Sequence, residues 1–484
     1  MPTDTVQSVD TDAAGQFTAG EQEQSRGLAR LAFGFTKLAE KYFPDAFIFV
    51  ILTTIVVALA DVGVGAHPLE IASGFGSGFW SLIPFTLQMA MVAITGFVVA
   101  SSPPCSKLIA KLASVPMTGP QATAWVAFVS MGASYLNWAL SLVLGGLLVR
   151  AIARRTDLRM DYRCASAAAY LGLGSTWALG LSSSSAMLQA NPASLPASIS
   201  QISGVIPLSD TIFLWQSVAL YFVLMICSVV VFYFASPRGA QVKTAADLGV
   251  DVFDEFAAPQ KQERPGDWFE FTPILPILIV LLAVGYFWSE FSTKGVLGTV
   301  SSLNNYNFFF LMLGLLLHRN IRSFLTAVAK AVPTTTGVII QFPFYGAIAA
   351  MLTHVAGSDG VTISHHLSQL FVSIANEDVF PIVIGIYSAI LGFLVPSGGG
   401  KWIIEAPYVL QAAKDIHAHM GWAVQVYNAA EALPNLINPF WMLPLLGIVK
   451  LQAKDIVGFT FTQLLVSGPI VFFLLWFFGE TLAG

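Results

Sequence analysis

Charged side chains are scarce in this sequence. Asp, Glu, Lys and Arg make up 11% of its 484 residues, whereas hydrophobic residues make up 55% and the mean hydropathy is +0.71. In soluble globular proteins about a quarter of the residues are charged, so this composition excludes an ordinary soluble domain and predicts an integral membrane protein. The net charge of −5 gives no basic surface for a nucleic acid, and none is expected as a partner.

Cysteine is almost absent. The three cysteines, Cys105, Cys164 and Cys227, are far apart and lie in apolar surroundings. An odd and isolated set of this kind predicts core thiols and excludes a disulfide or metal framework.

The usual motifs of enzymes are also missing. The sequence has no His-x-x-x-His pair, glycine-rich phosphate loop or Gly-x-Ser-x-Gly elbow in a suitable context. His365 and His366, with Glu377 and Asp378, could suggest a metal site, but their position predicts a hydrated interfacial helix. We therefore expect no enzyme, and no cofactor other than Na⁺ as a coupling ion.

Two polar stretches divide the chain. The first 25 residues lack the basic and apolar regions of a signal peptide, so we expect a cytoplasmic head, followed at 28–43 by an amphipathic surface helix. The second stretch is charged and contains proline. The predicted organisation is a head with surface helix at 1–43, a first half at 44–235, a cytoplasmic linker at 236–268 and a second half at 269–484.

Apolar runs predict how often the chain crosses the membrane. A helix needs about 20 residues to span a hydrocarbon core of ~30 Å, with some allowance for tilt and interruptions. Nine runs meet this condition, so the expected fold is an all-α polytopic membrane protein. These runs are 44–61, 81–100, 164–190, 211–235, 273–291, 303–318, 335–356, 420–449 and 460–482.

Two further apolar regions are broken in the middle. Residues 119–153 contain "ASYLNWAL", and residues 379–415 contain "LVPSGGGKW". Three successive glycines and a proline do not hold a regular helix, and Lys401 is costly in hydrocarbon. We predict that both regions are re-entrant hairpins, which enter and leave the membrane on the same side.

The lysines and arginines support this topology, because basic residues concentrate in short cytoplasmic loops. With the amino terminus inside, 20 of the 23 lie on the cytoplasmic side, and Lys294, Lys401 and Lys414 lie outside. If either hairpin were instead a single crossing, every later loop would change sides, and the cytoplasmic bias of the basic residues would be lost between the two hairpins. We predict a multi-pass protein of the inner (plasma) membrane, with its carboxyl terminus outside and with the first hairpin entering from the cytoplasm and the second from the outside.

The two halves share one order of parts. The segment "LQMAMVAITGFVVASS" resembles "IQFPFYGAIAAMLTHV", which places Gln88 opposite Gln341. Each is followed by a surface segment, a hairpin and a broken crossing, at 164–190 and 420–449. Opposed copies of this kind are typical of inverted-repeat transporters, whose sites lie where broken helices meet. The charge distribution is the stronger argument, since so faint a similarity can arise by chance between apolar helices.

Four polar interruptions are expected to meet at one level. They are the first hairpin tip, "GLSSSSAML" at 180–188, the second tip at 396–401 and "EALPNLINP" at 431–439. Non-helical backbone within a membrane is tolerated only where it is buried in protein or lines a wet cavity. Amides at helix N-termini bind anions, and hydroxyl, amide and carbonyl oxygens coordinate small cations such as sodium. The sequence therefore predicts a shared cavity with both kinds of ligand.

The predicted cavity places the run Ser182 to Ser185 opposite Asn435 and Asn438, and Ser397 with its glycines opposite Asn137. For any one serine, a bond to its own helix is the competing interpretation. Trp138 and Trp402 either line a pocket for an apolar tail or pack at the tips. The candidate substrate ligands are Asn137, Trp138, Ser183, Ser184, Ser185, Ser397, Gly398, Gly399, Gly400, Lys401, Trp402 and Asn435, and the candidate sodium ligands are Ser182, Asn137 and Asn438.

Lys401 has two compatible interpretations. Its ammonium could form an ion pair with Glu405, one turn further on, or with Glu431 in the broken crossing. Alternatively it neutralises a substrate carboxylate or stands where a second cation would bind. Glu431 is interpreted as a partner of the buried lysine, with a proton carrier as the alternative.

The segments "FLVPSGGGKWIIEAP" and "GLSSSSAML" resemble the Ato-type short-chain fatty acid transporter family, in the ion transporter superfamily that also holds sodium-coupled dicarboxylate carriers. The likeness covers most of 30–484 and is most specific at Pro396 to Gly400 with Trp402. It implies uptake of small monocarboxylates such as acetoacetate or butyrate by a dimer in which a transport domain slides against a scaffold, an elevator mechanism. The family usually has glutamine at the position of Lys401, which leaves open a more anionic substrate or a charge that replaces one sodium.

The expected function is a secondary transporter of short-chain carboxylates, driven by sodium because small polar oxygens crowd the site. A proton-coupled carrier using Glu405 or Glu431, or a carrier of di- or tricarboxylates, remains the alternative. A membrane-embedded hydrolase is disfavoured because no histidine falls near the four interruptions. An anion channel is disfavoured because opposed repeats with two re-entrant hairpins favour alternating access.

Overall fold

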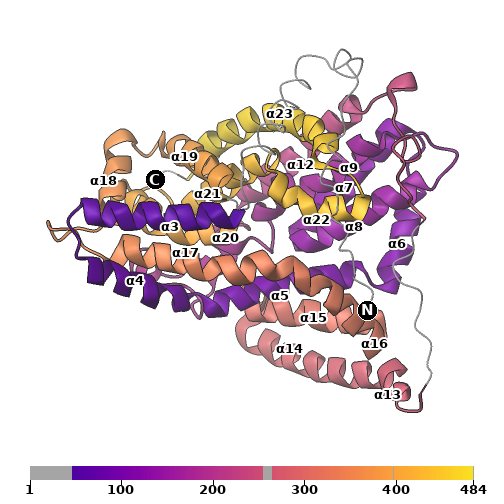
Figure 1. Ribbon diagram of the computed structural model, residues 1–484, viewed down its shortest axis with the longest axis horizontal. Coiled ribbons are helices and arrows are strands. Elements are labelled where there is room, and N and C mark those ends of the chain that lie inside the picture. Colours follow the sequence, from indigo (N-terminus) through magenta and orange to yellow (C-terminus); the bar gives the residue numbers. More distant parts are fainter. Residues whose placement is uncertain (1–45, 254–263, 396, 483–484) are drawn as a thin grey trace, which may run out of the picture.

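The computed structural model describes residues 46–253, 264–395 and 397–482 (Figure 1). All the regular secondary structure in these residues is helical, apart from a single β bridge between Ala356 and Thr362. The predicted all-α class is confirmed for this part of the chain. The expected head and surface helix, at 1–43, lie outside the described residues.

Helices occupy all nine ranges that were predicted as crossings. Five stretches of the described chain are long and apolar enough to span a membrane, which agrees with a multi-pass membrane protein; these are Ile83–Ala100, Trp215–Ala235, Ile274–Val296, Ile321–His354 and Ala453–Glu480. The nine ranges correspond to α3 (Ala46–Gly63), α5 (Ile83–Ala100), α9 (Tyr162–Leu171) with α10 (Ser184–Ala190), α12 (Trp215–Ala235), α14 (Ile274–Val300), α15 (Leu303–His318), α17 (Thr336–His354), α21 (Met420–Asn435) with α22 (Pro439–Val449), and α23 (Ala453–Glu480).

The first broken region folds back on itself at Asn137. It forms α7 (Gly119–Leu136) and α8 (Trp138–Ala153), and the Ser141 hydroxyl of α8 donates a 2.7 Å hydrogen bond to the Ser130 carbonyl of α7. At the other end, Arg155 donates to the Pro116 carbonyl. The two ends of the region are therefore close together, as in a hairpin.

The second broken region also reverses direction. Its arms are α19 (Phe380–Leu394) and α20 (Gly398–Asp415), and the hydroxyls of Tyr387 and Tyr408 lie 2.8 Å apart across them. Ser397 begins α20, because its side chain accepts a hydrogen bond from the Gly400 amide. Both hairpin tips thus carry a helix N-terminus that a polar residue caps.

The two broken crossings lose α-helical geometry for local reasons. In the first, α9 continues into a π-helical turn, η1 (Gly172–Thr176), and a 3₁₀ turn, η2 (Trp177–Leu179), before an extended Gly180 precedes α10. In the second, Pro434 and Pro439 flank the break between α21 and α22, and neither carries a backbone N–H for a helical bond. The breaks therefore lie at 172–183 and 436–438, and they overlap only in part with the predicted stretches 180–188 and 431–439, whose residues 184–188 and 431–435 are helical.

Shorter helices accompany the long ones, and one of them, α18 (Ile363–Ile374), contains His365 and His366, for which a helix was predicted. The order α5, α6 (Pro103–Ala113), hairpin, broken helix and α12 is matched by α17, α18, hairpin, broken helix and α23. Another short helix, α4 (Pro68–Ser81), lies against α17 (Figure 1). A Cβ atom on Gly346 of α17 would lie 2.6 Å from the Gly78 carbonyl oxygen of α4, so these two helices touch through their backbones.

The helices from α13 (Asp267–Phe271) to α16 (Ile321–Ala331) lie together at one edge of the molecule, at the lower right of Figure 1. Within this group α14 is the most exposed helix: Leu282 and Trp288 leave 73% and 78% of their surface uncovered. Apolar side chains that protein does not cover are expected where a helix faces lipid.

Candidate functional site

The first hairpin tip is fastened to the first helix break. The Trp138 amide donates a 3.0 Å hydrogen bond to the Ser182 hydroxyl, and the Leu181 amide donates to the Tyr135 carbonyl at 2.8 Å. Asn137 caps α8: its side-chain oxygen accepts from the Ala139 and Leu140 amides, each at 2.9 Å. The polar groups of the first tip therefore bond to the helix break of the same half.

Two long helices support this tip. The Asn137 side-chain amide donates to the Val92 carbonyl of α5 at 3.2 Å, and Gly96, one turn further along α5, leaves room for Asn137 because a Cβ there would overlap it. From α15, the Tyr306 hydroxyl donates a 2.7 Å bond to the Leu136 carbonyl. The position of Asn137 is consequently fixed from both sides.

The second hairpin tip lies against the first helix break, and its glycines allow this close approach. A Cβ on Gly398 would overlap the Trp177 ring of η2, and a Cβ on Gly399 would lie 2.9 Å from the Ser184 Cβ atom of α10. The Tyr427 hydroxyl of α21 also donates to the Gly398 carbonyl. Because only glycine leaves this space empty, the three-glycine run is explained by packing of backbone against aromatic rings.

The two breaks also lie side by side. The Tyr170 hydroxyl, just before the first break, donates a 2.8 Å bond to the Asn435 carbonyl at the start of the second. The Ser185 hydroxyl donates to the Asn428 side chain of α21. Asn438 completes the junction by donating to the Phe393 carbonyl beside the second tip, at 3.4 Å. All four interruptions are thus joined by contacts among tips and breaks.

The pairing within this junction differs from the predicted one. Ser185 meets Asn428, not Asn435 or Asn438, and Ser182 meets the first tip. The contacts described for Ser397 are within its own tip and with Tyr345, not with Asn137. The physical reason is that each tip needs nearby partners for its free backbone groups, and the first tip finds them in its own half.

Lys401 forms the predicted ion pair with Glu405. Its Nζ atom lies 2.9 Å from Glu405 Oε1, 2.9 Å from the Ser388 carbonyl oxygen and 4.3 Å from the centre of the Tyr427 ring. The Ser388 hydroxyl donates to the other carboxylate oxygen at 2.6 Å. Both charged side chains are fully buried, so the ammonium is already satisfied by groups of the second hairpin and by α21.

Other buried polar groups at the junction lack such partners. Among the residues that the structure describes, both carboxyl oxygens of Glu431 and both side-chain polar atoms of Asn435 have no hydrogen-bond partner, although these residues are 1% and 0% exposed. The indole N–H groups of Trp177 and Trp402 are unpartnered in the same way. Buried polar groups are nearly always hydrogen-bonded in proteins, so these unpartnered groups are candidates for contact with a bound polar ligand.

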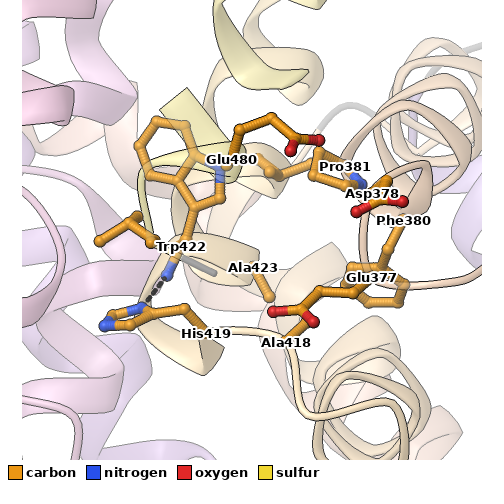
Figure 2. Close-up of a pocket in the computed structure, with 12 residues that line it drawn as sticks. Glu377, Asp378, Phe380, Pro381, Ala418, His419, Trp422, Ala423 and Glu480 are labelled. Atoms are coloured by element: carbon orange, nitrogen blue, oxygen red, sulfur yellow. Dashed lines mark hydrogen bonds between the residues drawn. The ribbon is translucent and has the colours of Figure 1, made fainter. Parts of the chain in front are cut away.

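A small pocket lies elsewhere, at the carboxyl-terminal end of α23. Figure 2 shows Glu377, Asp378 and Glu480 around it, with the His419 ring accepting a hydrogen bond from the Trp422 amide. Its volume of about 20 Å³ holds a water molecule, not a carboxylate substrate.

His365 and His366, which the sequence analysis named together with Glu377 and Asp378, are not among the residues that line this pocket. His366 instead faces Asp359, with 3.3 Å between Nε2 and Oδ2. In the described residues no group of three or more His, Cys, Asp or Glu side chains is arranged to hold a metal ion.

Comparison with known proteins identifies the family of this chain. A family model described as "Short chain fatty acid transporter" matches residues 27–478. A protein of Escherichia coli (strain K12) that carries the name of short-chain fatty acid transporter is 33% identical over 448 residues, 92% of this chain and 98% of that protein. The chain belongs to the short-chain fatty acid transporter family. Members of this family are named as transporters and not as enzymes, which confirms both the resemblance and the expectation that the chain is no enzyme.

Further comparisons agree with this membership. A protein of Haemophilus influenzae with the same name is 32% identical over 458 residues, 93% of this chain and 100% of that protein. Among solved structures, the YdaH transporter of Alcanivorax borkumensis, reported to have an unusual topology, aligns with a TM-score of 0.52 at 17% identity. The alignment covers 91% of this chain and 98% of that one, which supports a shared helical transporter fold.

Several residues of the junction escaped the sequence analysis. Tyr345 and Tyr427, which contact the second tip, read in the sequence as ordinary aromatic residues of apolar helices. Asn428 carried a usable signal, since it is an asparagine within an apolar run and lies one helical turn before Glu431. Trp177 gave no signal, because it looks like one more apolar residue ahead of the serine run.

Proposed function

We propose that this protein is a secondary transporter of short-chain carboxylates, such as acetoacetate or butyrate, coupled to sodium and working by an elevator type of alternating access. The observation that carries the proposal is the meeting of two hairpin tips and two helix breaks in one buried junction. Unwound backbone of this kind is retained in membrane transporters where substrates and ions bind. Membership of the transporter family agrees with it.

The substrate carboxylate is best placed beside the second tip. Trp177, Trp402 and Asn435 offer buried N–H donors without partners, and the hydroxyls of Ser183 and Ser184 begin α10 next to Gly398 and Gly399. These donors are neutral, whereas Lys401 is already paired with Glu405. A singly charged carboxylate bound by neutral donors leaves the site with one negative charge, which favours binding together with a cation.

The sodium ligands are proposed at the first tip. The Ser182 hydroxyl oxygen accepts the bond that joins tip and break, the Asn137 side-chain oxygen caps the helix that begins at Trp138, and Tyr306 approaches both residues. An oxygen-only set suits a small hard cation. Asn438, the third predicted sodium ligand, belongs to the second break and donates to the Phe393 carbonyl of the second hairpin, so the proposed site at the first tip uses Asn137 and Ser182.

Alternating access in this proposal uses the two halves as inverted repeats. Their matching order of helices supports this, and so does the contact that each tip makes with the long helix that begins this order in its own half: Asn137 with α5, and Gly400 with Tyr345 of α17. The tips and breaks would move together against α14 and its neighbours. In the proposed assembly two chains form a dimer in the inner membrane, surrounded by lipid, with the amino terminus in the cytoplasm.

The test is uptake of radiolabelled butyrate into proteoliposomes under an imposed inward sodium gradient. Replacing sodium by choline should abolish the driven uptake, and protein-free liposomes correct for passive entry of the protonated acid. Uptake driven equally well by a pH gradient without sodium would overturn the sodium coupling. Competition by succinate or citrate would instead favour a carrier of di- or tricarboxylates. Flux that does not saturate would favour a channel, and turnover of esters would favour a hydrolase.

A further inference from the structure

Among the described residues of the junction, Glu431 is the one carboxylic side chain outside the Lys401–Glu405 ion pair. It lies in the middle of α21, 1% exposed, with no hydrogen-bond partner for either carboxyl oxygen among the described residues. Its stem packs against α19, where Gly392 leaves room for it: a Cβ there would lie 3.5 Å from Glu431 Cγ. The carboxyl group is therefore buried in a tight and non-aqueous place.

The surrounding charges do not compensate an ionised Glu431. From α20, Lys401 and Glu405 both act on it electrostatically, but they form a neutral pair with each other. Tyr170 from α9 and Tyr427 from its own helix face it as well, and their hydroxyls are used by the Asn435 and Gly398 carbonyls. An ionised Glu431 would be an uncompensated negative charge without a donor, which is costly in a buried site.

The remaining elements packed against α21 do not change this balance. The segments η1, η2 and α10 contain no titratable side chain. From α19 the titratable residue is Tyr387, which pairs with Tyr408. In α23, Lys454, Asp455 and Glu480 lie in the end turns of the helix.

We propose that Glu431 takes up a proton when the junction opens to the outside, holds it in this conformation and releases it to water when the junction opens to the cytoplasm, after which Lys401 shares its charge between Glu405 and Glu431. The step breaks the carboxyl O–H bond and leaves a carboxylate, with the proton going to solvent. A second metal cation fits beside Glu431 less well, because the positive charge of Lys401 would repel it. The protonation of Glu431 does not depend on the proposed function. Its consequence does, because a proton moves with the substrate, in addition to sodium, only if the protein is a transporter.

The first experiment does not need transport activity. Asp61, in α3, is also buried without a hydrogen-bond partner for its carboxyl oxygens, so infrared spectra of purified protein are compared in an Asp61→Asn background. At neutral pH this background protein should show the C=O band of a protonated buried carboxylic acid, and the band should be absent when Glu431→Gln is added. The matched control is Glu377→Gln, the same change at the solvent-facing pocket of Figure 2, which should keep the band. A spectrum of the background protein without the band, or a band that survives in Glu431→Gln, overturns the proposal.

The second experiment measures the consequence for transport. With equal sodium on both sides, an acidic outside should stimulate butyrate uptake several-fold in wild type and in Glu377→Gln, after subtraction of protein-free liposomes. In Glu431→Gln the stimulation should be lost while exchange of labelled for unlabelled butyrate persists. Stimulation that survives in Glu431→Gln contradicts the inference alone, whereas no carrier-mediated uptake under any gradient contradicts the proposed function and leaves the infrared result to decide on Glu431.

Discussion

Lys401 and Glu405 lie one turn apart on α20 with 2.9 Å between Nζ and Oε1, and neither side chain is exposed. A buried ion pair of this kind is costly to break from one side, because the remaining charge has no counterpart, but it is far less costly to remove as a whole. This relationship explains how a lysine is tolerated beside a glycine-rich tip in an apolar protein.

The pair gives a prediction about stability. Lys401→Gln should lower the stability of the folded protein by about 3–5 kcal/mol, seen as a lower thermal midpoint in detergent. Glu405→Gln should do the same, while the double variant should recover most of the loss. If Lys401→Gln is as stable as wild type, the pair does not hold the second hairpin. A single variant that folds normally but prefers a different substrate would instead support the lysine as a carboxylate ligand.

The close contact at the second tip predicts the effect of a single methyl group. Gly398→Ala and Gly400→Ala place a Cβ into the rings of Trp177 and Tyr345, and overpacking typically costs about 1–3 kcal/mol. Butyrate uptake should fall about tenfold or more. Gly458→Ala in α23 is the control, because no atom lies within 4 Å of a Cβ there. Normal uptake by both tip variants would show that the tip is not closely packed during transport.

Asn137 is expected to affect both stability and sodium use. Asn137→Ala removes the cap of α8 and should cost about 0.5–2 kcal/mol. It should also raise the sodium concentration for half-maximal uptake. Thr118→Ala removes the cap of α7 at the far end of the same hairpin, so it should cost similar stability without changing the sodium requirement. If both variants raised the sodium concentration for half-maximal uptake by the same amount, the role of Asn137 would be structural only.

The unpartnered indole of Trp177 gives a prediction about the substrate. Trp177→Phe keeps an aromatic ring at this position but removes the N–H donor and the outer ring edge, Cη2 and Cζ2, that lies against Gly398. A hydrogen bond to a charged group contributes about 1.5–3 kcal/mol, so KM for butyrate should rise roughly tenfold to a hundredfold. Trp80→Phe, at a position that is 69% exposed, should leave KM unchanged. An unaltered KM in Trp177→Phe would place the carboxylate elsewhere.

The sequence predicted the fold more fully than the site. Helix lengths and the breaks at Asn137, Gly180 to Ser183, Ser397 and Leu436 to Asn438 follow from local rules, since glycine, proline and capping residues act within a few positions. The glycine run itself was expected to be non-helical, but it forms the first turn of α20 because Ser397 caps it. The short helices α4 and α16 were not predicted, because a short helix that packs on a neighbour needs no apolar run of membrane length.

The partners within the site depend on distances across the whole chain. The sequence marked Ser185 as a site residue, but its contact with Asn428 joins residues 243 positions apart. Which face of α21 meets α10 is decided by packing around the breaks, which periodicity does not determine. Lys401 was the exception, because a glutamate four residues away on a helix is a local neighbour.

The central claim is that the two tips and two breaks enclose a site that opens in turn to each side of the membrane. Labelling of Ser184→Cys, in a background where Cys105, Cys164 and Cys227 are replaced, tests it most directly, because Ser184 is the first residue of α10 and lies against the second tip. A membrane-impermeant thiol reagent should label this cysteine from either side, and butyrate with sodium should slow both reactions. Labelling from one side only, unaffected by butyrate, would contradict the account.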